Sequence, residues 1–155
     1  MDSQAHAFRM EEIIEHYIED LAIGDEAVFA KTITEADIVM FSGVTGDMNP
    51  VHVNESFAKQ TRFKGRIAHG MLVSSLISTV LGMKLPGPGC IYISQSLKFT
   101  APVYAGDTVT VRAKIIEIIK ERKRIRCQTT AWVDNIVVVE GEAMMMVPSK
   151  TDKNR

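Results

Sequence analysis

The sequence has little cysteine, with only Cys90 and Cys127 among its 155 residues. The two lie far apart and lack the spacing of a zinc or redox motif, so no disulfide scaffold is indicated. This favours a reducing compartment, and we expect the protein in the cytoplasm. Each cysteine falls in a segment of alternating apolar residues, so we interpret both as small buried hydrophobic residues.

Charge of one sign is equally scarce. The formal net charge is −1, and no long run of either sign occurs. This balance gives no electrostatic reason to expect nucleic acid or an anionic membrane as a partner. The most apolar stretch, residues 71–85, is interrupted by serines, Gly82 and Lys84 and is too short for a typical membrane span. The N-terminus carries acids throughout and lacks the apolar region of a secretory signal.

The residues that are present fit one globular domain. Hydrophobic residues make up 46% of the chain and charged residues 24%, which allows a real core. We predict a helical extension over residues 1–23, a single domain over 24–148 and a polar tail over 149–155. Within the extension, apolar residues at three-and-four spacing predict an amphipathic helix over 9–21.

Capping and turn residues divide the first half of the domain. A strand is expected over 27–33, followed by a helix over 35–44 with Thr34 as N-cap and Asp37 in the capping-box position. The apolar side of this helix is expected to consist of Ile38, Phe41 and Val44. Residues 46–52 predict a loop of constrained shape, because a proline disfavours the helical conformation in the residue before it. A short helical piece over 54–60 and a loop over 61–66 complete this half.

The segment 71–85 is the most diagnostic structural signal. It is long enough for four helical turns and apolar on nearly every face, so it must be surrounded by protein. Four segments of apolar-polar alternation follow, as in an antiparallel meander. The residues expected to face the core are Ile91, Ile93, Leu97 and Phe99, then Val109, Val111, Ala113 and Ile115, then Ile125, Cys127, Thr129, Ala131 and Val133, with a last strand over 136–147. The alternation slips near Ile115-Ile116, which predicts a bulge or a strong bend.

These elements predict an α+β hot-dog fold, in which an antiparallel sheet of about five strands wraps around a long buried central helix. The sheet has to curl around the helix so that its apolar face covers most of it. A single sheet of this kind leaves one side of the helix and an edge strand uncovered. We therefore expect a homodimer, with further association left open.

Asp47 and His52 are the first candidates for chemistry. They lie five residues apart in a turn that contains Asn49 and Pro50, so their side chains can converge on a small volume. A carboxylate and an imidazole around one water are the smallest set of acid–base groups that can add water to a polarised double bond. The ordinary alternatives are an Asx turn at Asp47 and an exposed loop histidine at His52.

His69 and Gly70 lie where the central helix is expected to begin. The first backbone N–H groups of a helix lack partners and carry the positive end of its dipole. Gly70 would let a ligand oxygen approach the backbone, which suits a thioester carbonyl that becomes negative during the reaction. The alternative is that His69 only caps the helix and Gly70 relieves a tight helix–sheet contact.

Other chemistry-bearing motifs are missing. The serines of the central helix, Ser74, Ser75 and Ser78, have no nucleophile-elbow glycines around them, and buried helical serines commonly bond back to a carbonyl one turn earlier. No phosphate-binding loop, dinucleotide fingerprint or metal-ligand spacing occurs. We therefore expect no metal and no cofactor.

Several elements together resemble the MaoC-like (R)-specific enoyl-CoA hydratases. They are Gly46-Asp47-Met48-Asn49-Pro50-Val51-His52, Arg66-Ile67-Ala68-His69-Gly70-Met71-Leu72 and Leu85-Pro86-Gly87-Pro88-Gly89, with Ser94-Gln95-Ser96-Leu97-Lys98-Phe99 and Pro102-Val103-Tyr104-Ala105-Gly106-Asp107. The likeness covers about residues 25–147. The D-x-N-P-x-H element is specific, and its order with the A-H-G helix start makes coincidence improbable.

The resemblance implies a hot-dog homodimer that hydrates 2-enoyl-CoA thioesters, substrates of fatty acid metabolism, with its active site near the subunit boundary. It makes Asp47 and His52 the acid–base pair and Gly70 the oxyanion-hole residue. Asn49 matches the motif's asparagine, a shaping or hydrogen-bonding residue. The family's active-site serine on the central helix matches Ser75. His69 is expected beside the substrate.

A basic group precedes the site, and we expect Arg62, Lys64 and Arg66 to pair with phosphates of a coenzyme A arm. The alternative is a solvated basic loop. Three other functions remain open: a 3-hydroxyacyl-acyl-carrier-protein dehydratase with the same catalytic residues, a hot-dog acyl-CoA thioesterase, and a non-catalytic subunit that binds acyl thioesters. The D-x-N-P-x-H loop argues against the thioesterase, and the presence of both Asp47 and His52 argues against the non-catalytic subunit.

Overall fold

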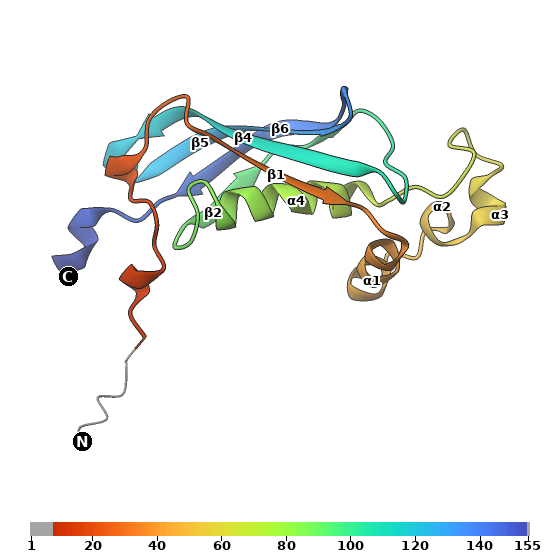
Figure 1. Ribbon diagram of the computed structural model, residues 1–155, viewed down its shortest axis with the longest axis horizontal. Coiled ribbons are helices and arrows are strands. Elements are labelled where there is room, and N and C mark those ends of the chain that lie inside the picture. The colour runs from red at the N-terminus through yellow and green to blue at the C-terminus, as the bar shows by residue number, and fades with distance from the viewer. Residues whose placement is uncertain (1–7, 155) are drawn as a thin grey trace, which may run out of the picture.

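The computed structural model describes residues 8–154, which form one antiparallel sheet with a helix against one face (Figure 1). The strands are β1 (Glu26–Thr32), β2 (Ile91–Gln95), β3 (Lys98–Phe99), β4 (Thr108–Ile119), β5 (Arg124–Val133) and β6 (Ile136–Met146). The α-helices are α1 (Glu35–Thr45), α2 (Pro50–Val53), α3 (Glu55–Ala58) and α4 (Gly70–Met83). Four 3₁₀ turns are η1 (Met10–Glu12), η2 (Ile18–Asp20), η3 (Lys120–Arg122) and η4 (Lys150–Asn154).

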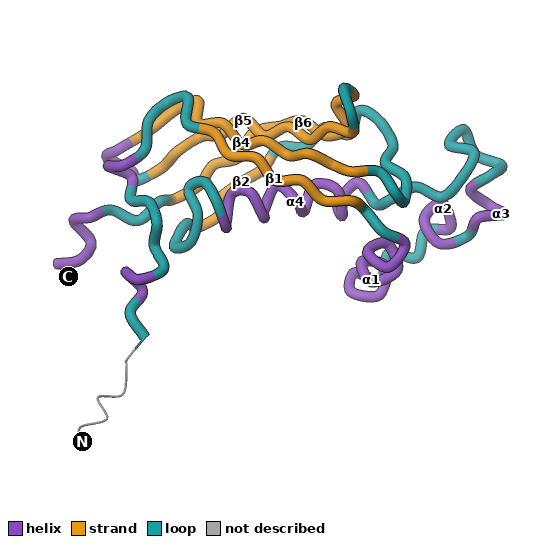
Figure 2. Tube along the Cα trace, viewed as in Figure 1, coloured by secondary structure: helices purple, strands orange, loops and turns teal. Residues whose placement is uncertain are grey.

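The strands follow the order β1-β4-β5-β6-β2, and β3 also pairs with β6. Figure 2 shows them as one layer that lies over α4, while α1, α2 and α3 gather beyond one end of the sheet. The segment with η1 and η2 and the C-terminal turn η4 lie at the opposite end (Figure 1). This arrangement confirms the predicted α+β hot-dog fold.

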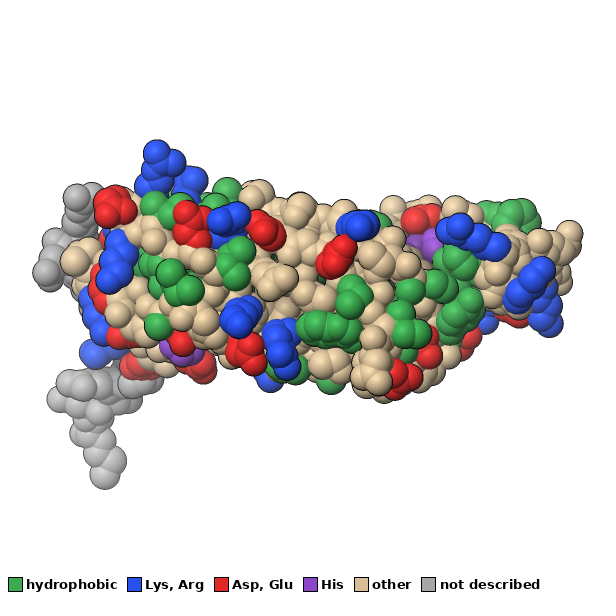
Figure 3. Space-filling view, turned by 90° about the horizontal axis from the view of Figure 1, so that it is seen from above, with side chains coloured by type: hydrophobic (Ala, Val, Ile, Leu, Met, Phe, Trp, Pro, Cys, Tyr) green, Lys and Arg blue, Asp and Glu red, His purple; other side chains and the backbone are tan. Residues whose placement is uncertain are grey.

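The alternation of β4 and β5 supplies most of the sheet's contribution to the core. Val109, Val111, Ala113 and Ile115 of β4 are completely buried, because successive side chains of a strand point to opposite faces. The pairing of β4 with β5 shifts register between Ile115 and Glu117, which confirms the predicted bulge. The polar face of the sheet carries interspersed charges of both signs (Figure 3), some of them paired, such as Arg126 with Glu117.

Helix α4 buries one broad face against the sheet. Its buried residues are Leu72, Val73, Ser74, Leu76, Ile77, Val80 and Leu81. The expectation that it is buried all round is wrong for the single chain, because Met71, Ser75, Ser78 and Met83 are exposed. The expected uncovered side of the helix is thus confirmed. Among the described residues, no helix is long and apolar enough to cross a membrane.

The helix predicted over 9–21 does not form. The segment contains only η1 and η2, joined by irregular chain. The N–H of Ile18 donates to the carbonyl of Pro148, and Ile18 and Leu21 are buried in the core. Short isolated helices are marginal in water, so tertiary contacts decided the backbone conformation here.

Two further expectations need correction. The strand predicted over 91–99 is divided into β2 and β3, and three of its expected core residues, Ile91, Ile93 and Phe99, are exposed. In α1 the capping box of Thr34 and Asp37 is confirmed, whereas Val44 is 85% exposed.

The two cysteines are free thiols. Cys127 is buried, and burial raises the pKa of its thiol to about 12. Burial also raises the pKa of Cys90. Because the thiolate is the reactive form of cysteine, both are unsuited to nucleophilic chemistry. The expected burial is confirmed for Cys127, whereas Cys90 is only partly buried.

Candidate active site

The Asp47 loop is shaped by the end of α1. Gly46 takes the left-handed conformation, with φ of 78°, and its N–H donates to the carbonyl of Ser42. Glycine adopts this conformation without the penalty of a Cβ atom. Asp47 then begins an Asx turn, in which its Oδ1 accepts from the N–H of Asn49 at 3.1 Å. The carboxylate is therefore held at the helix end and remains exposed.

Residues 50–53 form the single turn α2 instead of the expected loop. Asn49 is its N-cap, with Oδ1 accepting from the N–H of Val51 at 3.3 Å. Pro50 occupies the first turn, where its missing N–H costs nothing. The turn brings His52 back toward the Asp47 loop. The D-x-N-P-x-H spacing is thus an Asx turn followed by a capped helical turn.

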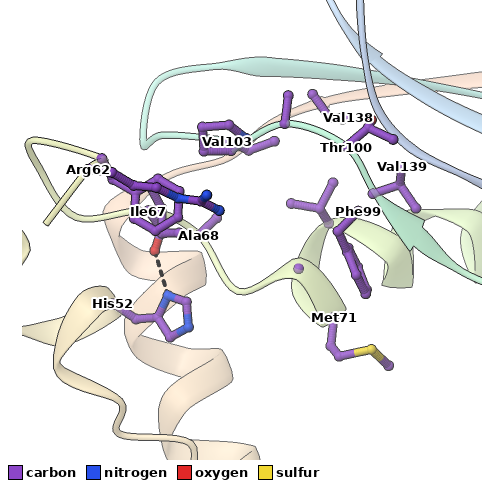
Figure 4. Close-up of a pocket in the computed structure, with 15 residues that line it drawn as sticks. His52, Arg62, Ile67, Ala68, Met71, Phe99, Thr100, Val103, Val138 and Val139 are labelled. Carbon is purple, nitrogen blue, oxygen red and sulfur yellow. Dashed lines mark hydrogen bonds between the residues drawn. The ribbon is translucent and has the colours of Figure 1, made fainter.

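His52 points from α2 toward the chain that leads into α4 (Figure 4). Its Nδ1 lies 2.8 Å from the carbonyl oxygen of Ile67. Because a carbonyl can only accept, Nδ1 carries the hydrogen, and in the neutral ring Nε2 keeps its lone pair. The side chain is therefore oriented as a proton acceptor, with 9% of its surface exposed.

His69 lies beneath His52. Their rings stack with centroids 3.8 Å apart, and His69 is only 2% exposed. Its Nε2 lies 3.0 Å from the backbone oxygen of Asp47 and 3.2 Å from Oγ of Ser42. This residue was expected beside the substrate, but its ring is buried between α1 and α2.

A cavity of about 330 Å³ adjoins His52 and the start of α4. Its walls are mostly apolar and include Phe99, Val103, Val138 and Val139. Gly70 also lines it, and a Cβ atom at that position would lie 2.8 Å from the ring of Phe99. A side chain at this position would therefore displace the ring of Phe99. The first N–H groups of α4 begin beside this cavity, with the positive end of the helix dipole.

The other predicted site residues are dispersed. Ser75 lies on the exposed side of α4 and donates to the carbonyl of Leu72 at 2.6 Å, which is the ordinary bond of a helical serine. Arg62 lines the cavity, whereas Lys64 is exposed on the loop.

Arg66 already has protein partners. It pairs with Glu35 at 2.9 Å and with Glu55 at 3.4 Å, and it donates to the carbonyl of His52 at 3.4 Å. Its guanidinium therefore ties α1, α2 and α3 together. This leaves Arg62 as the basic residue beside the cavity.

Asp47, His52 and His69 form one cluster, in which each offers a ligand-type atom and these atoms lie within 4.8 Å of one another. The sequence spacing indicated the convergence of Asp47 and His52 but not the presence of His69 beside them. Hydrogen bonds span about 2.8 Å, so a carboxylate oxygen and an imidazole nitrogen at this separation can share one water. The same donor set could hold a divalent cation.

Two residues around the site were not singled out by sequence. Ser42 is buried below His69, and its only signal was its position one turn after Ile38 on the buried side of α1. Phe99 was expected in the core, not over Gly70. Both depend on how α1 and β3 meet the start of α4.

The family of MaoC like domains matches residues 20–137. The chain belongs to this family. Among curated relatives, the (R)-specific enoyl-CoA hydratase of Rhodospirillum rubrum is 52% identical over 90% of this chain and 97% of its own length. The 3-hydroxybutyryl-CoA dehydratase of Methylorubrum extorquens is 48% identical over 88% of this chain and 87% of its own.

Two solved structures of R-hydratases are also similar to this chain. An R-hydratase from Pseudomonas aeruginosa in its unliganded form matches with a TM-score of 0.82 and 40% identity, over 89% of this chain and 88% of that chain. The (R)-hydratase from A. caviae involved in PHA biosynthesis matches with a TM-score of 0.81 and 35% identity, over 84% and 99%. The resemblance inferred from the motifs is confirmed.

Proposed function

We propose that this MaoC-like protein is an (R)-specific 2-enoyl-CoA hydratase, a hydro-lyase that adds water reversibly to a trans-2-enoyl-CoA and forms the (R)-3-hydroxyacyl-CoA. One observation carries the proposal. Asp47 and His52 present acceptor atoms within 4.8 Å of each other, and His52 lines an apolar cavity that begins at Gly70. The names of the relatives support the same reaction.

The chemistry follows from these positions. A water held between the Asp47 carboxylate and Nε2 of His52 loses a proton as its oxygen attacks the β-carbon. The pair then returns a proton to the α-carbon, so atoms balance as H and OH across the double bond. The two proton transfers are assigned to Asp47 and His52 as a pair. The N–H of Gly70 donates to the thioester carbonyl oxygen as negative charge develops on that oxygen.

The reaction is tested with crotonyl-CoA. We expect loss of the enoyl thioester's ultraviolet absorbance, formation of (R)-3-hydroxybutyryl-CoA by chiral analysis, and no free thiol. Thiol release would identify a thioesterase. Inactivity with crotonyl-CoA and a longer enoyl-CoA, together with activity on the matching acyl-carrier-protein thioester, would identify the carrier-protein dehydratase instead. Inactivity with all of these would leave the non-catalytic binding subunit.

For the coenzyme A arm, we propose Arg62 as a phosphate partner. It lines the cavity, and its guanidinium carbon lies 4.9 Å from the centroid of the Phe63 ring. Arg62→Gln should raise KM for crotonyl-CoA and leave kcat nearly unchanged, because the phosphates lie far from the reacting carbons. Lys64→Gln, on the same exposed loop, is the matched comparison. An unchanged KM in the Arg62 variant would refute this assignment.

We also propose a homodimer formed through the uncovered side of α4 and the edge strand β2. Exposed apolar residues occur on both, including Met71 and Met83 on α4 and Ile91 and Ile93 on β2. Unpaired sheet edges of this kind are templates for association. Sedimentation should give the mass of two chains, and Ile91→Glu should reduce it to one. Ile136→Glu, an equally exposed isoleucine of β6, is the control.

The two free cysteines are consistent with the proposed cytoplasmic location.

A further inference from the structure

A buried pair of side chains, Ser42 and His69, lies directly under the proposed catalytic loop. Each is 2% exposed. Ser42 contributes twice: its backbone oxygen accepts from the N–H of Gly46 at 2.9 Å, and its Oγ lies 3.2 Å from Nε2 of His69. His69 in turn reaches Asp47, with Nε2 3.0 Å from the backbone oxygen. The pair therefore joins the end of α1 to the start of α4.

The hydrogen-bond partners fix the form of His69. The backbone oxygen of Asp47 can only accept, so Nε2 of His69 carries the hydrogen. Nδ1 is then the lone-pair nitrogen of a neutral ring. Among residues 8–154, that buried atom has no hydrogen-bond partner, so a hydrogen there would be left unpaired at a cost. The one ring N–H is thus directed at the backbone of Asp47 and not toward the cavity.

Stacking adds a second constraint. The ring of His69 lies between His52, at a centroid distance of 3.8 Å, and Phe41, at 4.9 Å. It packs against the plane of His52, while Ile67 binds the Nδ1 edge of the same ring. His69 therefore contacts both members of the proposed acid–base pair, one through its N–H and one through its face.

We propose that His69 is a positioning residue, whose Nε2–H holds the Asp47 backbone and thereby sets the separation between the Asp47 carboxylate and His52, with Ser42 supporting it from below. This inference rests on the proposed hydratase function. It gives His69 a role through other residues, in place of the substrate contact expected from the sequence. A displacement of reacting groups by about 1 Å can cost about a hundredfold in rate, so the effect should be large.

Three substitutions separate the hydrogen bond from the space that His69 fills. His69→Gln places an amide N–H near the position of Nε2, whereas His69→Asn is one methylene shorter and cannot reach Asp47. His69→Phe keeps a ring against His52 and Phe41 but has no donor. On crotonyl-CoA we expect kcat to fall about a hundredfold in the Asn and Phe variants and less than about fivefold in the Gln variant, with KM nearly unchanged in all three.

The control is His16, a histidine outside the site whose ring also meets a backbone carbonyl. Nδ1 of His16 lies 3.2 Å from the oxygen of Pro86, at the far end of α4, so His16→Gln and His16→Phe should keep wild-type kcat. Melting temperatures identify variants that fold. Wild-type kcat in a folded His69→Phe or His69→Asn variant would overturn the proposal, as would equal losses in the Gln and Asn variants. If the Phe variant does not fold, the Gln-to-Asn ratio decides.

Failure of this inference differs from failure of the proposed function. If Asp47→Asn and His52→Ala are inactive while all His69 variants are normal, the reaction stands and the positioning role falls. If Asp47→Asn and His52→Ala keep full activity, the proposed catalytic pair itself is wrong, and the role of His69 falls with it.

Discussion

Irregular chain adjoins both ends of α4, but only the N-terminal end lies beside a cavity. At the C-terminal end the following residues fold back onto the helix: the N–H groups of Lys84 and Leu85 donate to Val80, and that of Gly87 donates to Leu81. At the N-terminal end, Gly70 opens onto a cavity beside His52. One end is thus closed by protein, whereas at the other the first N–H groups, which have no partner within the helix, begin beside a cavity.

The difference separates stability from catalysis. The N-terminal segment contacts the closed end, where Nδ1 of His16 lies 3.2 Å from the oxygen of Pro86. Ile18 and Leu21 of the same segment are buried in the core. The open end is built from polar loops that Arg66, His69 and the Asn49 cap hold in place. We expect substitutions at the closed end to change the free energy of unfolding and substitutions at the open end to change the rate.

The largest effect is expected at the open end. Asp47→Asn and His52→Ala should each lower kcat on crotonyl-CoA by about 10²–10⁴-fold, because each removes a member of the acid–base pair. Circular dichroism should show folded protein in both cases. His16→Ala, at the closed end, is the comparison and should keep wild-type kcat. A near-wild-type rate in either site variant would remove the proposed mechanism.

The closed end should respond in the opposite way. Ile18 is 3% exposed, and truncating a buried isoleucine to alanine typically costs about 2–5 kcal/mol. Ile18→Ala should therefore lower the free energy of unfolding by that amount, measured by urea titration, and leave kcat of the folded enzyme unchanged. Ile13→Ala, in the same segment but 47% exposed, should change it by less than about 0.5 kcal/mol. Equal effects of the two would show that the segment does not dock as described.

A steric change at Gly70 is expected to have a smaller effect. The added Cβ of Gly70→Ala would lie 2.8 Å from ring atoms of Phe99, and overpacking typically costs about 1–3 kcal/mol. Phe99 must move within the cavity, so kcat/KM should fall about tenfold. The double variant Gly70→Ala with Phe99→Leu should recover part of the loss. Gly43→Ala in α1, with open space around its Cβ, is the control and should raise the free energy of unfolding by up to about 1 kcal/mol. An unchanged kcat/KM in Gly70→Ala would contradict the close contact with Phe99.

The smallest effect concerns a carboxylate of the open end that does not catalyse. Lys31 holds Asp37 at 2.8 Å, and this hydrogen bond, with those from Thr34, lowers the pKa of Asp37 to about 2. A depressed pKa stabilises the fold above the ordinary value near 3.8, and this stabilisation is lost as pH falls toward 2. Asp37→Asn should lower the free energy of unfolding at pH 7 by a few tenths to about 1 kcal/mol and leave kcat unchanged. The difference from wild type should shrink between pH 4 and pH 2; a constant difference would exclude the charge as its cause.

Local signals in the sequence were reliable where nearby residues make the hydrogen bonds of the backbone. Thr34 and Asp37 predicted the start of α1 because both members of a capping box lie within one turn. The slip in alternation near Ile116 predicted the bulge of β4, because alternation is read over a few neighbouring residues. In contrast, the helix over 9–21 was wrong, because Pro148, more than a hundred residues away in sequence, binds the N–H of Ile18.

The candidate site divides in the same way. The D-x-N-P-x-H motif predicted Asp47 and His52 together because their spacing is short, and the A-H-G motif predicted the helix start at Gly70. No local pattern could show that His69 stacks under His52 or that Arg66 forms an ion pair with Glu35. These contacts join residues 17 or more positions apart, and they exist only after α1, α2 and α4 have packed.

The sequence by itself therefore determined the class of fold, the central helix, and the motif residues that identify a MaoC-like hydratase, since alternation, capping and turn chemistry act over a few residues. The tertiary structure alone decided which of those residues meet. It placed His69 within hydrogen-bond distance of the Asp47 backbone, Arg62 beside the cavity, and Phe99 over Gly70. These outcomes depend on long-range packing, in which each side chain's partners come from other elements of the chain.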